Sequence, residues 1–543
     1  MPRLVLGAVV IASLLPFVGK PFHIDDPMYL WAAQHITSDP LHFYDFDVNW
    51  YGSFAPMYEV NKNPPLVSFY LAAVGLLLGW SEVALHLGML LPAIALAFGV
   101  QALARQLGAR PLMAALTAWV TPVVLVSATT LMSDVLMLSV WCWAATLWID
   151  GIDRGSRGRL IAGAVLLGLC PLIKYFGLAL LPLLAVATWG RSRRVLPWLG
   201  YLVIPVAIIG AYQLYMMLYH DWNPLADVAQ YALTIEVKDT YAPTERILVG
   251  LSFLGGCLLT TLFFAPYLWS RATLFAWGGL AVATALGLGA LDAIGPLALS
   301  VDGATRWDLI IQMAVYVVAG THLLALATRT LWQDRTADVL VLVLWLGGVW
   351  FFASFTNWTT TARAVLPAAP AAAILLARAL ARRPSAPGTG ATAVVLGAGL
   401  ALSLTVAWAD YGLAASARAA AAHVTKHHAD TGGTVYFQGA WGFQQYMETA
   451  GATRLDFDRV RLLPRDLVVT PANNTNLVTL PEWALHELET IELPAGRGVA
   501  TLSPERGAGF YAALYGPLPF TFGPVPPERY TIARVTRPLA FHP

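Results

Sequence analysis

Long apolar runs separated by short polar loops recur along most of this 543-residue chain. A helix needs about 20 apolar residues to cross the hydrocarbon core of a bilayer, and many of these runs approach that length. Backbone groups inside hydrocarbon must be satisfied within their own segment, which favours helices. Only 12% of the residues are charged, against roughly 25% in soluble proteins. The sequence therefore predicts a mainly α-helical, polytopic membrane protein.

Charged residues divide the apolar sequence into about thirteen predicted transmembrane helices. The first run, Leu4 to Gly19, is short and follows Arg3, as in a signal peptide. No small-x-small cleavage pattern follows it, which favours a first span instead. The later spans are predicted near residues 83–104, 111–128, 131–149, 160–173, 176–190, 195–217, 247–267, 272–291, 309–328, 337–355, 363–381 and 391–411.

Basic residues predict which side each loop occupies. If the amino terminus is cytoplasmic, the arginine-rich loops from Arg105 to Arg383 all fall inside, and the outer loops carry Asp and Glu. The apolar stretch 66–79 is too short to cross comfortably, and a crossing there would move every later basic loop outside. We therefore predict a juxtamembrane helix at the outer interface, within an outer loop of residues 20–82. The predicted location is the cell inner (cytoplasmic) membrane.

Residues 412–543 differ in character from the apolar part. They are richer in Pro, Gly, charge and short β-like runs, which predicts a small soluble α/β domain on the periplasmic side. The predicted domains are thus a transmembrane domain, 1–411, and an extracytoplasmic domain, 412–543. A net charge of +1 gives no reason to expect nucleic acid. Cys142, Cys170 and Cys257 lie in apolar segments, which argues against disulfides and a thiolate metal site.

Several ionisable residues fall on the predicted outer side, near the ends of spans or in the first outer loop. They are Asp25, Asp26, Lys62, Asp134, Lys174 and Arg363. A sugar donor that carries a lipid phosphate needs positive charge to hold the phosphate and stabilise it as the leaving group. An acceptor hydroxyl needs a carboxylate as general base. The three basic residues could supply the first, and Asp25 or Asp26 the second.

Each of these residues also has a structural interpretation. An acidic pair just beyond a helix is often only solvated, and Lys174 could extend to lipid headgroups. Arg363 could anchor its helix end against lipid phosphate. For Asp134 a capping role at a tight hairpin is favoured slightly over chemistry. The functional prediction therefore depends on the set and not on one residue.

In this order, the motifs resemble those of the glycosyltransferase C superfamily, in the branch of protein O-mannosyltransferases and lipid A aminoarabinose transferases. The matching segments are Asp25-Asp26-x-x-Tyr29, Asn63-Pro64-Pro65-Leu66, Leu131-Met132-Ser133-Asp134, Lys174-Tyr175 and Arg363 to Pro370. The resemblance covers roughly residues 1–380. Two positions depart from the family pattern. Asn63 stands where the family has lysine, with Lys62 one position earlier, and Ala364 replaces a tyrosine.

The resemblance implies a glycosyltransferase C fold and inverting transfer of a sugar from a polyprenyl-phosphate donor, such as undecaprenyl phosphate. Asp25 would be the base, with Asp26 assisting or orienting. Lys62, Lys174 and Arg363 would bind the donor phosphate, and the supporting residues would be Tyr29, Asn63, Asp134 and Tyr175. No cofactor is implied, although a divalent ion bridging Asp25 and Asp26 stays open. The acceptor would be a glycan, a lipid or a protein, and the sequence specifies neither it nor the sugar.

Two other functions fit a chain of this kind. A transporter or flippase for a lipid-linked glycan would place ionisable residues near the membrane midplane and break paired helices. The middles of the predicted spans contain almost no such residues, so this function ranks second. A membrane anchor for the outer domain would leave the number of spans unexplained. In that domain, the run from Trp441 to Tyr446 could stack on a sugar, but packing of its aromatic residues into a core is favoured.

Overall fold

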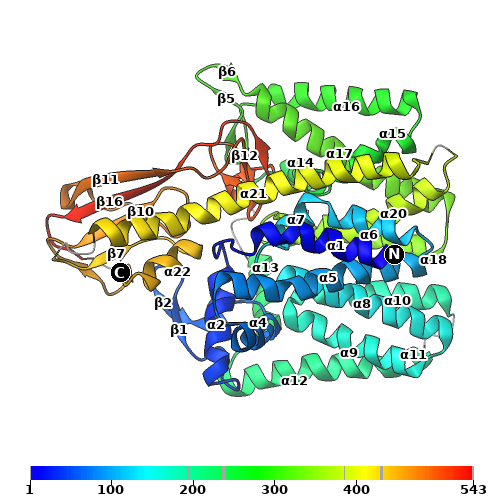
Figure 1. The fold of residues 1–543 in the computed structure, drawn as a ribbon, viewed down its shortest axis with the longest axis horizontal. Coiled ribbons are helices and arrows are strands. Elements are labelled where there is room, and N and C mark those ends of the chain that lie inside the picture. Colours follow the sequence, from blue (N-terminus) through cyan, green and yellow to red (C-terminus); the bar gives the residue numbers. More distant parts are fainter. Residues whose placement is uncertain (1, 193–195, 235–239, 385, 429–431, 541–543) are drawn as a thin grey trace.

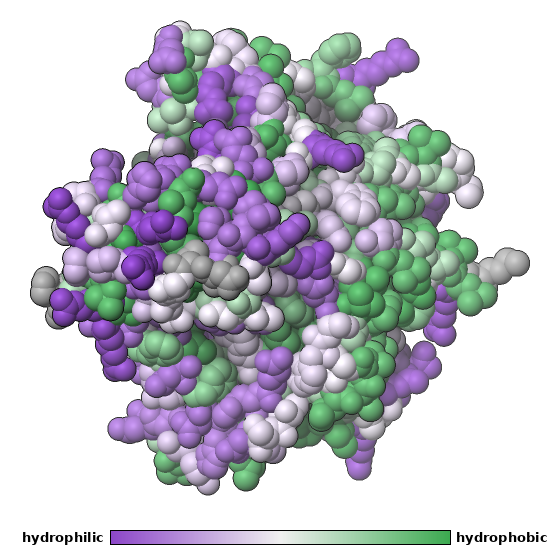
Figure 2. Space-filling model, turned by 60° about the vertical axis from the view of Figure 1, so that its left-hand side comes forward, coloured by the Kyte–Doolittle hydropathy of each residue, from purple (hydrophilic) through white to green (hydrophobic). Residues whose placement is uncertain are grey.

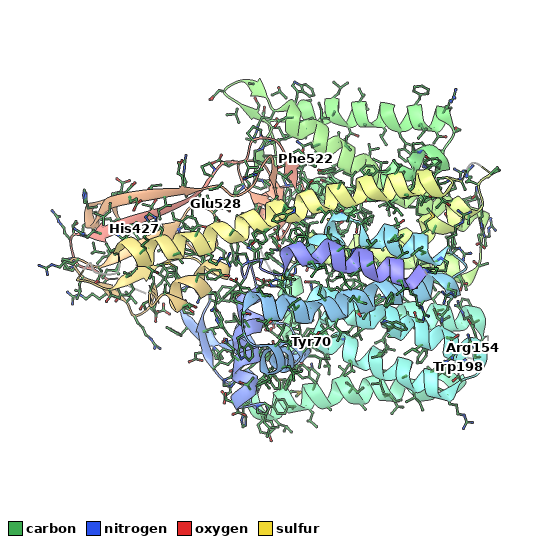
Figure 3. The ribbon with its side chains drawn as sticks, viewed as in Figure 1. Tyr70, Arg154, Trp198, His427, Phe522 and Glu528 are labelled. Carbon is green, nitrogen blue, oxygen red and sulfur yellow. The ribbon has the colours of Figure 1, made fainter. Side chains whose placement is uncertain are left out.

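The computed structural model describes residues 2–192, 196–234, 240–384, 386–428 and 432–540. Helices form an elongated bundle, and a sheet lies beyond one end of it (Figure 1). Arg154 and Trp198 lie at the opposite end of the molecule from His427 (Figure 3). The basic loop around Arg154 is therefore far from the C-terminal part. This separation agrees with the prediction that the two lie on opposite sides of the membrane.

The longer helices make up the bundle. They are α1 (Pro2–Leu14), α5 (Glu82–Gln106), α6 (Pro111–Trp119), α8 (Ser133–Arg154), α9 (Arg157–Ile173), α10 (Leu180–Arg191), α12 (Val203–His220), α14 (Pro243–Cys257), α16 (Arg271–Gly289), α17 (Trp307–Gln333), α18 (Ala337–Phe351), α20 (Ala368–Ala381) and α21 (Thr389–His428). Short helices link or extend them. These are η1 (Leu15–Phe17), α7 (Pro122–Ser127), η2 (Tyr175–Ala179), α11 (Leu196–Leu199), η3 (Gly200–Leu202), α13 (Pro224–Thr234), η5 (Leu259–Phe264), α15 (Ala265–Leu268), η6 (Phe352–Thr356) and α19 (Ala362–Val365).

Every predicted crossing overlaps one or more of these helices, so the mainly helical, multi-pass character is confirmed. Within the described residues, 7 helices are long and apolar enough to cross a membrane unaided. The number is 8 if the pair formed by Pro243–Cys257 and Leu259–Leu268, bent by 72°, is one span. The total of about thirteen crossings therefore stays a prediction.

The predicted span 111–128 is two helices, α6 and α7, because proline interrupts it. Pro122 has no N–H to donate to the carbonyl of Ala118 four residues earlier. The Thr121 hydroxyl donates to that carbonyl instead, at 2.7 Å. The next free carbonyl, that of Val120, accepts bonds from Thr260 Oγ1 at 2.7 Å and Ser403 Oγ at 2.8 Å. Side chains of neighbouring helices thus satisfy the broken backbone, as a membrane interior requires.

The first predicted outer loop folds over one end of the bundle. It contains α2 (Asp26–Ser38), β1 (Asp47–Asn49), β2 (Phe54–Pro56), α3 (Met57–Val60) and α4 (Leu66–Leu78). Both α2 and α4 run across the bundle axis (Figure 1). The helix predicted at the interface is α4, which contacts α2 and α5. A Cβ at Gly88 of α5 would lie 2.4 Å from Val74 of α4, so this contact depends on the glycine.

The C-terminal part contains a 5-stranded sheet with the order β11-β16-β10-β7-β8. The strands are β11 (Leu485–Leu493), β16 (Glu528–Val535), β10 (Leu467–Pro471), β7 (Val435–Phe437) and β8 (Thr453–Arg454). The contacts β11–β16 and β16–β10 are antiparallel, whereas β10–β7 and β7–β8 are parallel. The end of α21 and α22 (Trp441–Thr449) pack on the sheet, where Phe443 and Met447 are buried. Packing of the Trp441–Tyr446 run into a core is therefore confirmed.

Five further pairs of short strands form ribbons outside this sheet: β3 (Ala293–Ile294) with β4 (Leu297–Ala298), β5 (Ser300–Val301) with β6 (Ala304–Thr305), β12 (Val499–Ala500) with β15 (Thr521–Phe522), β13 (Leu502–Ser503) with β14 (Ala508–Gly509), and β9 (Arg461–Leu462) with β17 (Leu539–Ala540). The short helices η7 (Glu482–Ala484) and η8 (Ala513–Tyr515) accompany them. On the face shown in Figure 2, hydrophilic side chains gather over the left and centre, and hydrophobic side chains are denser toward the right.

The predicted domain boundary after residue 411 falls inside α21, which continues to His428. The segment 495–520 then returns to the bundle, where Val499, Phe510 and Phe520 join the main hydrophobic core. The hydroxyl of Tyr241, ahead of α14, donates to the carbonyl of Ala513 at 2.6 Å. The C-terminal part is therefore packed onto the bundle and is not held by the chain connection alone.

A completely buried ion pair fixes this junction. Lys20 Nζ lies 2.5 Å from Asp410 Oδ2, and both side chains are 0% exposed. Lys20 also donates to Thr129 Oγ1 at 3.1 Å. Asp410 accepts bonds from Thr501 Oγ1 at 3.0 Å and from the Tyr511 hydroxyl at 2.8 Å. The pair thus joins the first loop, α21 and the returning C-terminal segment.

We expect Lys20→Met to lower the free energy of unfolding by about 3–5 kcal/mol, because Asp410 would stay buried without its cation. Thermal unfolding of the purified protein in one detergent would measure the change. Lys426→Met removes an exposed lysine from the same helix as Asp410 and should leave the midpoint unchanged. Equal midpoints for Lys20→Met and wild type would show that the pair does not stabilise the fold.

Candidate functional site

Four of the predicted site residues form one charge network. Arg363 donates from Nη1 to Asp25 Oδ2 at 2.6 Å and from Nε to Asp134 Oδ2 at 2.7 Å. Lys174 Nζ donates to the other oxygen of Asp134, Oδ1, at 2.6 Å. Two carboxylates and two cations therefore meet, although their positions in the sequence are far apart. The structure thus brings together four of the residues that the sequence analysis singled out.

The four side chains of the network differ in how much of each is exposed. The side chain of Asp134 is 3% exposed and that of Arg363 is 13% exposed. Lys174 is 22% exposed and Asp25 is 26% exposed. Asp134 is thus the buried anion that fixes both cations. Asp25 and Lys174 are the more exposed members of the network.

Separate elements bring these side chains together. Asp25 directly precedes α2, Asp134 lies in the first turn of α8, Lys174 separates α9 from η2, and Arg363 lies in α19. The capping role favoured for Asp134 is wrong. The N-cap of α8 is Met132, which makes no side-chain cap bond, and the Asp134 carboxylate is paired with the two cations instead. Ion pairing in a nearly dry site outweighs an interfacial cap because both cations would otherwise be partly buried without a counter-charge.

Asp26 does not join the network through its carboxylate. Its Oδ2 accepts the backbone N–H of His23 at 2.9 Å, and its Oδ1 accepts that of Leu131 at 2.8 Å. Burial raises the pKa of Asp26 to about 7. Ile24, which lies between His23 and Asp25 in the chain, has a backbone φ of 48°. This left-handed conformation is costly for a β-branched residue. The bonds to Asp26 hold this turn, which sets the direction of the neighbouring Asp25.

Predicted supporting residues lie next to the network. The Tyr29 hydroxyl is 3.3 Å from Ser133 Oγ and accepts a bond from Asn63 Nδ2 at 3.2 Å. Tyr29 interacts electrostatically with the charged network, and burial raises the pKa of its hydroxyl to about 12. Tyr44, which sequence reasoning missed, donates to the Asn63 carbonyl at 2.9 Å. An aromatic residue in a polar loop gives no local signal of such a role.

The other predicted lysine, Lys62, is placed differently. Lys62 Nζ lies 2.8 Å from Asp227 Oδ2 on α13 and 5.6 Å from the centre of the Trp222 ring. The described contacts of Lys62 are thus with the α12–α13 region and not with the network. Tyr175 directly follows Lys174 and begins η2. The carboxylates of Asp25 and Asp26 have different partners, Arg363 for the first and the backbone N–H groups of His23 and Leu131 for the second.

A hollow of about 560 Å³ lies between the first loop and the C-terminal part. Trp31 and His35 of α2 line one side, and Gln444 and Arg454 line the other. Trp31 is six residues after Asp25, which is roughly 9 Å along a helix. One wall of the hollow is therefore formed by α2, the helix that begins directly after Asp25.

Comparisons with known proteins give one sequence match and several structural matches. Residues 62–212 match the family described as Dolichyl-phosphate-mannose-protein mannosyltransferase. This range contains Lys62, Asn63, Asp134, Lys174 and Tyr175, and it ends before Arg363. No curated protein matches the chain.

Two solved structures illustrate the structural similarity. The oligosaccharyltransferase of Archaeoglobus fulgidus has a TM-score of 0.46 and 14% identity, over 84% of this chain and 64% of that one. The chain thus spans less than two thirds of the archaeal protein. ArnT from Cupriavidus metallidurans, bound to undecaprenyl phosphate, has a TM-score of 0.42 and 14% identity, over 86% of this chain and 93% of that one. The match over residues 62–212 confirms that this chain resembles the glycosyltransferase C superfamily, as its ordered motifs predicted.

Proposed function

We propose that the protein is a membrane glycosyltransferase that moves a sugar from a polyprenyl-phosphate donor to an acceptor at the outer face of the inner membrane. The observation that carries this proposal is the network of Asp25, Asp134, Lys174 and Arg363. It combines a partly exposed carboxylate with two cations held by a buried one. The acceptor is a glycan, a lipid or a protein.

The charges suit the two ends of the reaction. Lys174 and Arg363 would bind the donor phosphate and stabilise it as it leaves. Asp25 would accept the proton of the acceptor hydroxyl. The hydroxyl oxygen then bonds to the anomeric carbon on the face opposite the phosphate, and the carbon–phosphate oxygen bond breaks. The sugar is transferred with inversion, and polyprenyl phosphate is released.

The ion pair between Asp25 and Arg363 links donor binding to base release. In the structure Asp25 shares Arg363 with Asp134. An anionic phosphate at Arg363 competes with Asp25 for the same guanidinium. Donor binding would therefore loosen Asp25 and leave its carboxylate for the acceptor. Asp134, the more buried of the two carboxylates, would keep the cations in place.

Transfer from a defined donor tests the proposal. Purified protein in lipid nanodiscs would receive undecaprenyl-phosphate sugars with a label on the sugar, together with an envelope extract as acceptor. We expect labelled product, and we expect free undecaprenyl phosphate to inhibit its formation. Absence of product with every donor, together with no binding of undecaprenyl phosphate, would contradict the proposal.

Binding of the lipid phosphate gives a second readout that does not depend on the sugar. A charge-assisted hydrogen bond contributes about 1.5–3 kcal/mol, so Lys174→Gln should weaken undecaprenyl phosphate binding roughly 10-fold to 100-fold. Lys426→Gln changes an exposed lysine in α21 and is the matched control. Equal affinities of the Lys174 variant and wild type would remove Lys174 from the phosphate site.

A further inference from the structure

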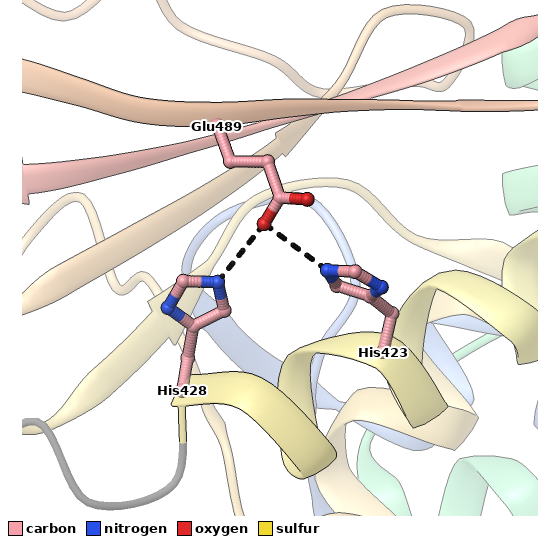
Figure 4. A group of neighbouring side chains, drawn as sticks. All are labelled: His423, His428 and Glu489. Carbon is pink, nitrogen blue, oxygen red and sulfur yellow. Dashed lines mark hydrogen bonds and ion pairs between the residues drawn. The ribbon is translucent and has the colours of Figure 1, made fainter.

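A second group of ligand-forming side chains lies away from the charge network, where α21 meets the sheet. His423 and His428 approach the same oxygen, Oε2 of Glu489 (Figure 4). The His423 Nε2 atom is 3.1 Å from it, and the His428 Nε2 atom is 3.2 Å from it. The three ligand atoms all lie within 4.8 Å of one another. No part of the proposed transfer reaction uses them.

A bulge in β11 turns Glu489 toward the helix. Glu487 pairs with Ala533 of β16, but Glu489 pairs with Ile532, so Leu488 is an extra residue. Directly paired residues of antiparallel strands share a face. Ile532 is fully buried in the core that also contains Val424 of α21, so Glu489 lies on the α21 face. Bulges commonly redirect a side chain in this way.

Without the bulge, Glu489 would be paired with Thr531. That position is now paired with Thr490, and the two threonine hydroxyls form an exposed hydrogen bond 3.1 Å long. The extra residue therefore moves a carboxylate from the solvent face to the side that carries the two histidines. Its side chain stays 41% exposed, and those of His423 and His428 are 27% and 14% exposed.

The two nitrogen–oxygen distances suit a tetrahedral metal ion. Zinc binds histidine nitrogen at about 2.0–2.1 Å and carboxylate oxygen at about 2.0–2.2 Å, which places neighbouring ligand atoms roughly 3.3 Å apart. The two nitrogen–oxygen distances are close to this value. Two histidines and one carboxylate are also a common ligand set for zinc that keeps one position open.

We propose that His423, His428 and Glu489 bind a divalent transition-metal ion, with Zn²⁺ as the best match. The ion would link the last turns of α21 to β11 and leave one coordination position facing solvent. It would thus fix the outer end of the long helix to the sheet. This site stands apart from the proposed transfer of sugar, and failure of either proposal leaves the other unaffected.

His427 offers a matched control beside the site. Its ring centre is 4.2 Å from that of His423, and its Nδ1 atom is 3.1 Å from the carbonyl oxygen of His423. It is exposed and lies outside the set of three converging ligand atoms. A histidine in the same turn can therefore be removed without taking away a ligand.

Zinc titration of the full chain tests the proposal. The protein would be purified without a polyhistidine tag, treated with a chelator and titrated with Zn²⁺ against a chromophoric competitor. We expect one equivalent to bind and the thermal unfolding midpoint to rise with zinc. We expect His428→Ala and Glu489→Gln each to lower the affinity by more than about 100-fold, since even residues behind the ligands change it 10-fold to 100-fold.

The control variant distinguishes a site from general histidine binding. His427→Ala should bind zinc with the wild-type affinity, and thermal unfolding without metal should show that each variant is folded. Cobalt substitution gives a spectroscopic check, because tetrahedral Co²⁺ absorbs much more strongly than the hydrated ion. Absence of stoichiometric binding, or equal loss in His427→Ala, would overturn the proposal and leave only an ion pair between the histidines and Glu489.

Discussion

Asp25→Asn is expected to lower the rate of sugar transfer by about 100-fold to 10,000-fold, the usual contribution of a general base. The amide has nearly the same shape as the carboxylate but cannot accept the proton of an acceptor hydroxyl. The first-order rate of labelled sugar transfer at saturating donor would measure the effect. Because the phosphate-binding cations remain, we expect undecaprenyl phosphate to bind the variant at least as tightly as it binds wild type.

A second acidic residue of the same loop provides the control. Asp45 is exposed and is not part of the charge network, so Asp45→Asn should transfer sugar at the wild-type rate. Thermal unfolding of both variants would show whether the fold is kept. Wild-type turnover in Asp25→Asn would exclude this carboxylate as the base, whatever the donor affinity.

Arg363→Lys is expected to lower turnover by about 100-fold to 1,000-fold, the loss typical of one missing donor to a developing negative charge. The guanidinium bonds two carboxylates at once, from Nε to Asp134 and from Nη1 to Asp25. A lysine amine keeps the positive charge but cannot reproduce this planar fork. Turnover and donor affinity, measured together, would separate a loss of positioning from a loss of charge.

Removal of the charge should affect the fold as well. Arg363→Ala would leave Asp25 without its partner and Asp134 with Lys174 alone, at an expected cost of about 3–5 kcal/mol. The control for Arg363→Lys is Arg335→Lys, which makes the same substitution at an exposed arginine near the opposite end of the bundle. Wild-type kinetics for Arg363→Lys would show that charge alone is sufficient and that the two-carboxylate geometry has no role.

Much of the site could be predicted because its members lie near the ends of apolar runs. Asp25, Asp134, Lys174 and Arg363 each lie at the end of an apolar run, and the basic loops place these ends on one side. Their location at one membrane face is therefore a prediction from the order of the residues and the basic loops. The sequence could not indicate that Asp26 would bond to the backbone of His23 and Leu131, because that bond depends on how two loops meet.

The buried pair of Lys20 and Asp410 was missed for a related reason. Asp410 lies near the end of a predicted span, where an acidic residue is usually solvated. In the structure the returning segment around Tyr511 covers it, so both charges are dry. An ionisable residue in an apolar helix was the available signal. Its partner could not be identified, since it lies at the other end of the chain.

The sequence by itself determined the helical segments, the membrane character and the residues available at each helix end. Hydrophobicity acts locally, so each apolar run specifies its own helix. The tertiary structure alone decided which charges share partners, where Lys62 is directed and how a bulge turns Glu489 toward two histidines. These outcomes depend on packing between distant segments, because a buried charge is stable only beside a partner that the fold brings within hydrogen-bond distance.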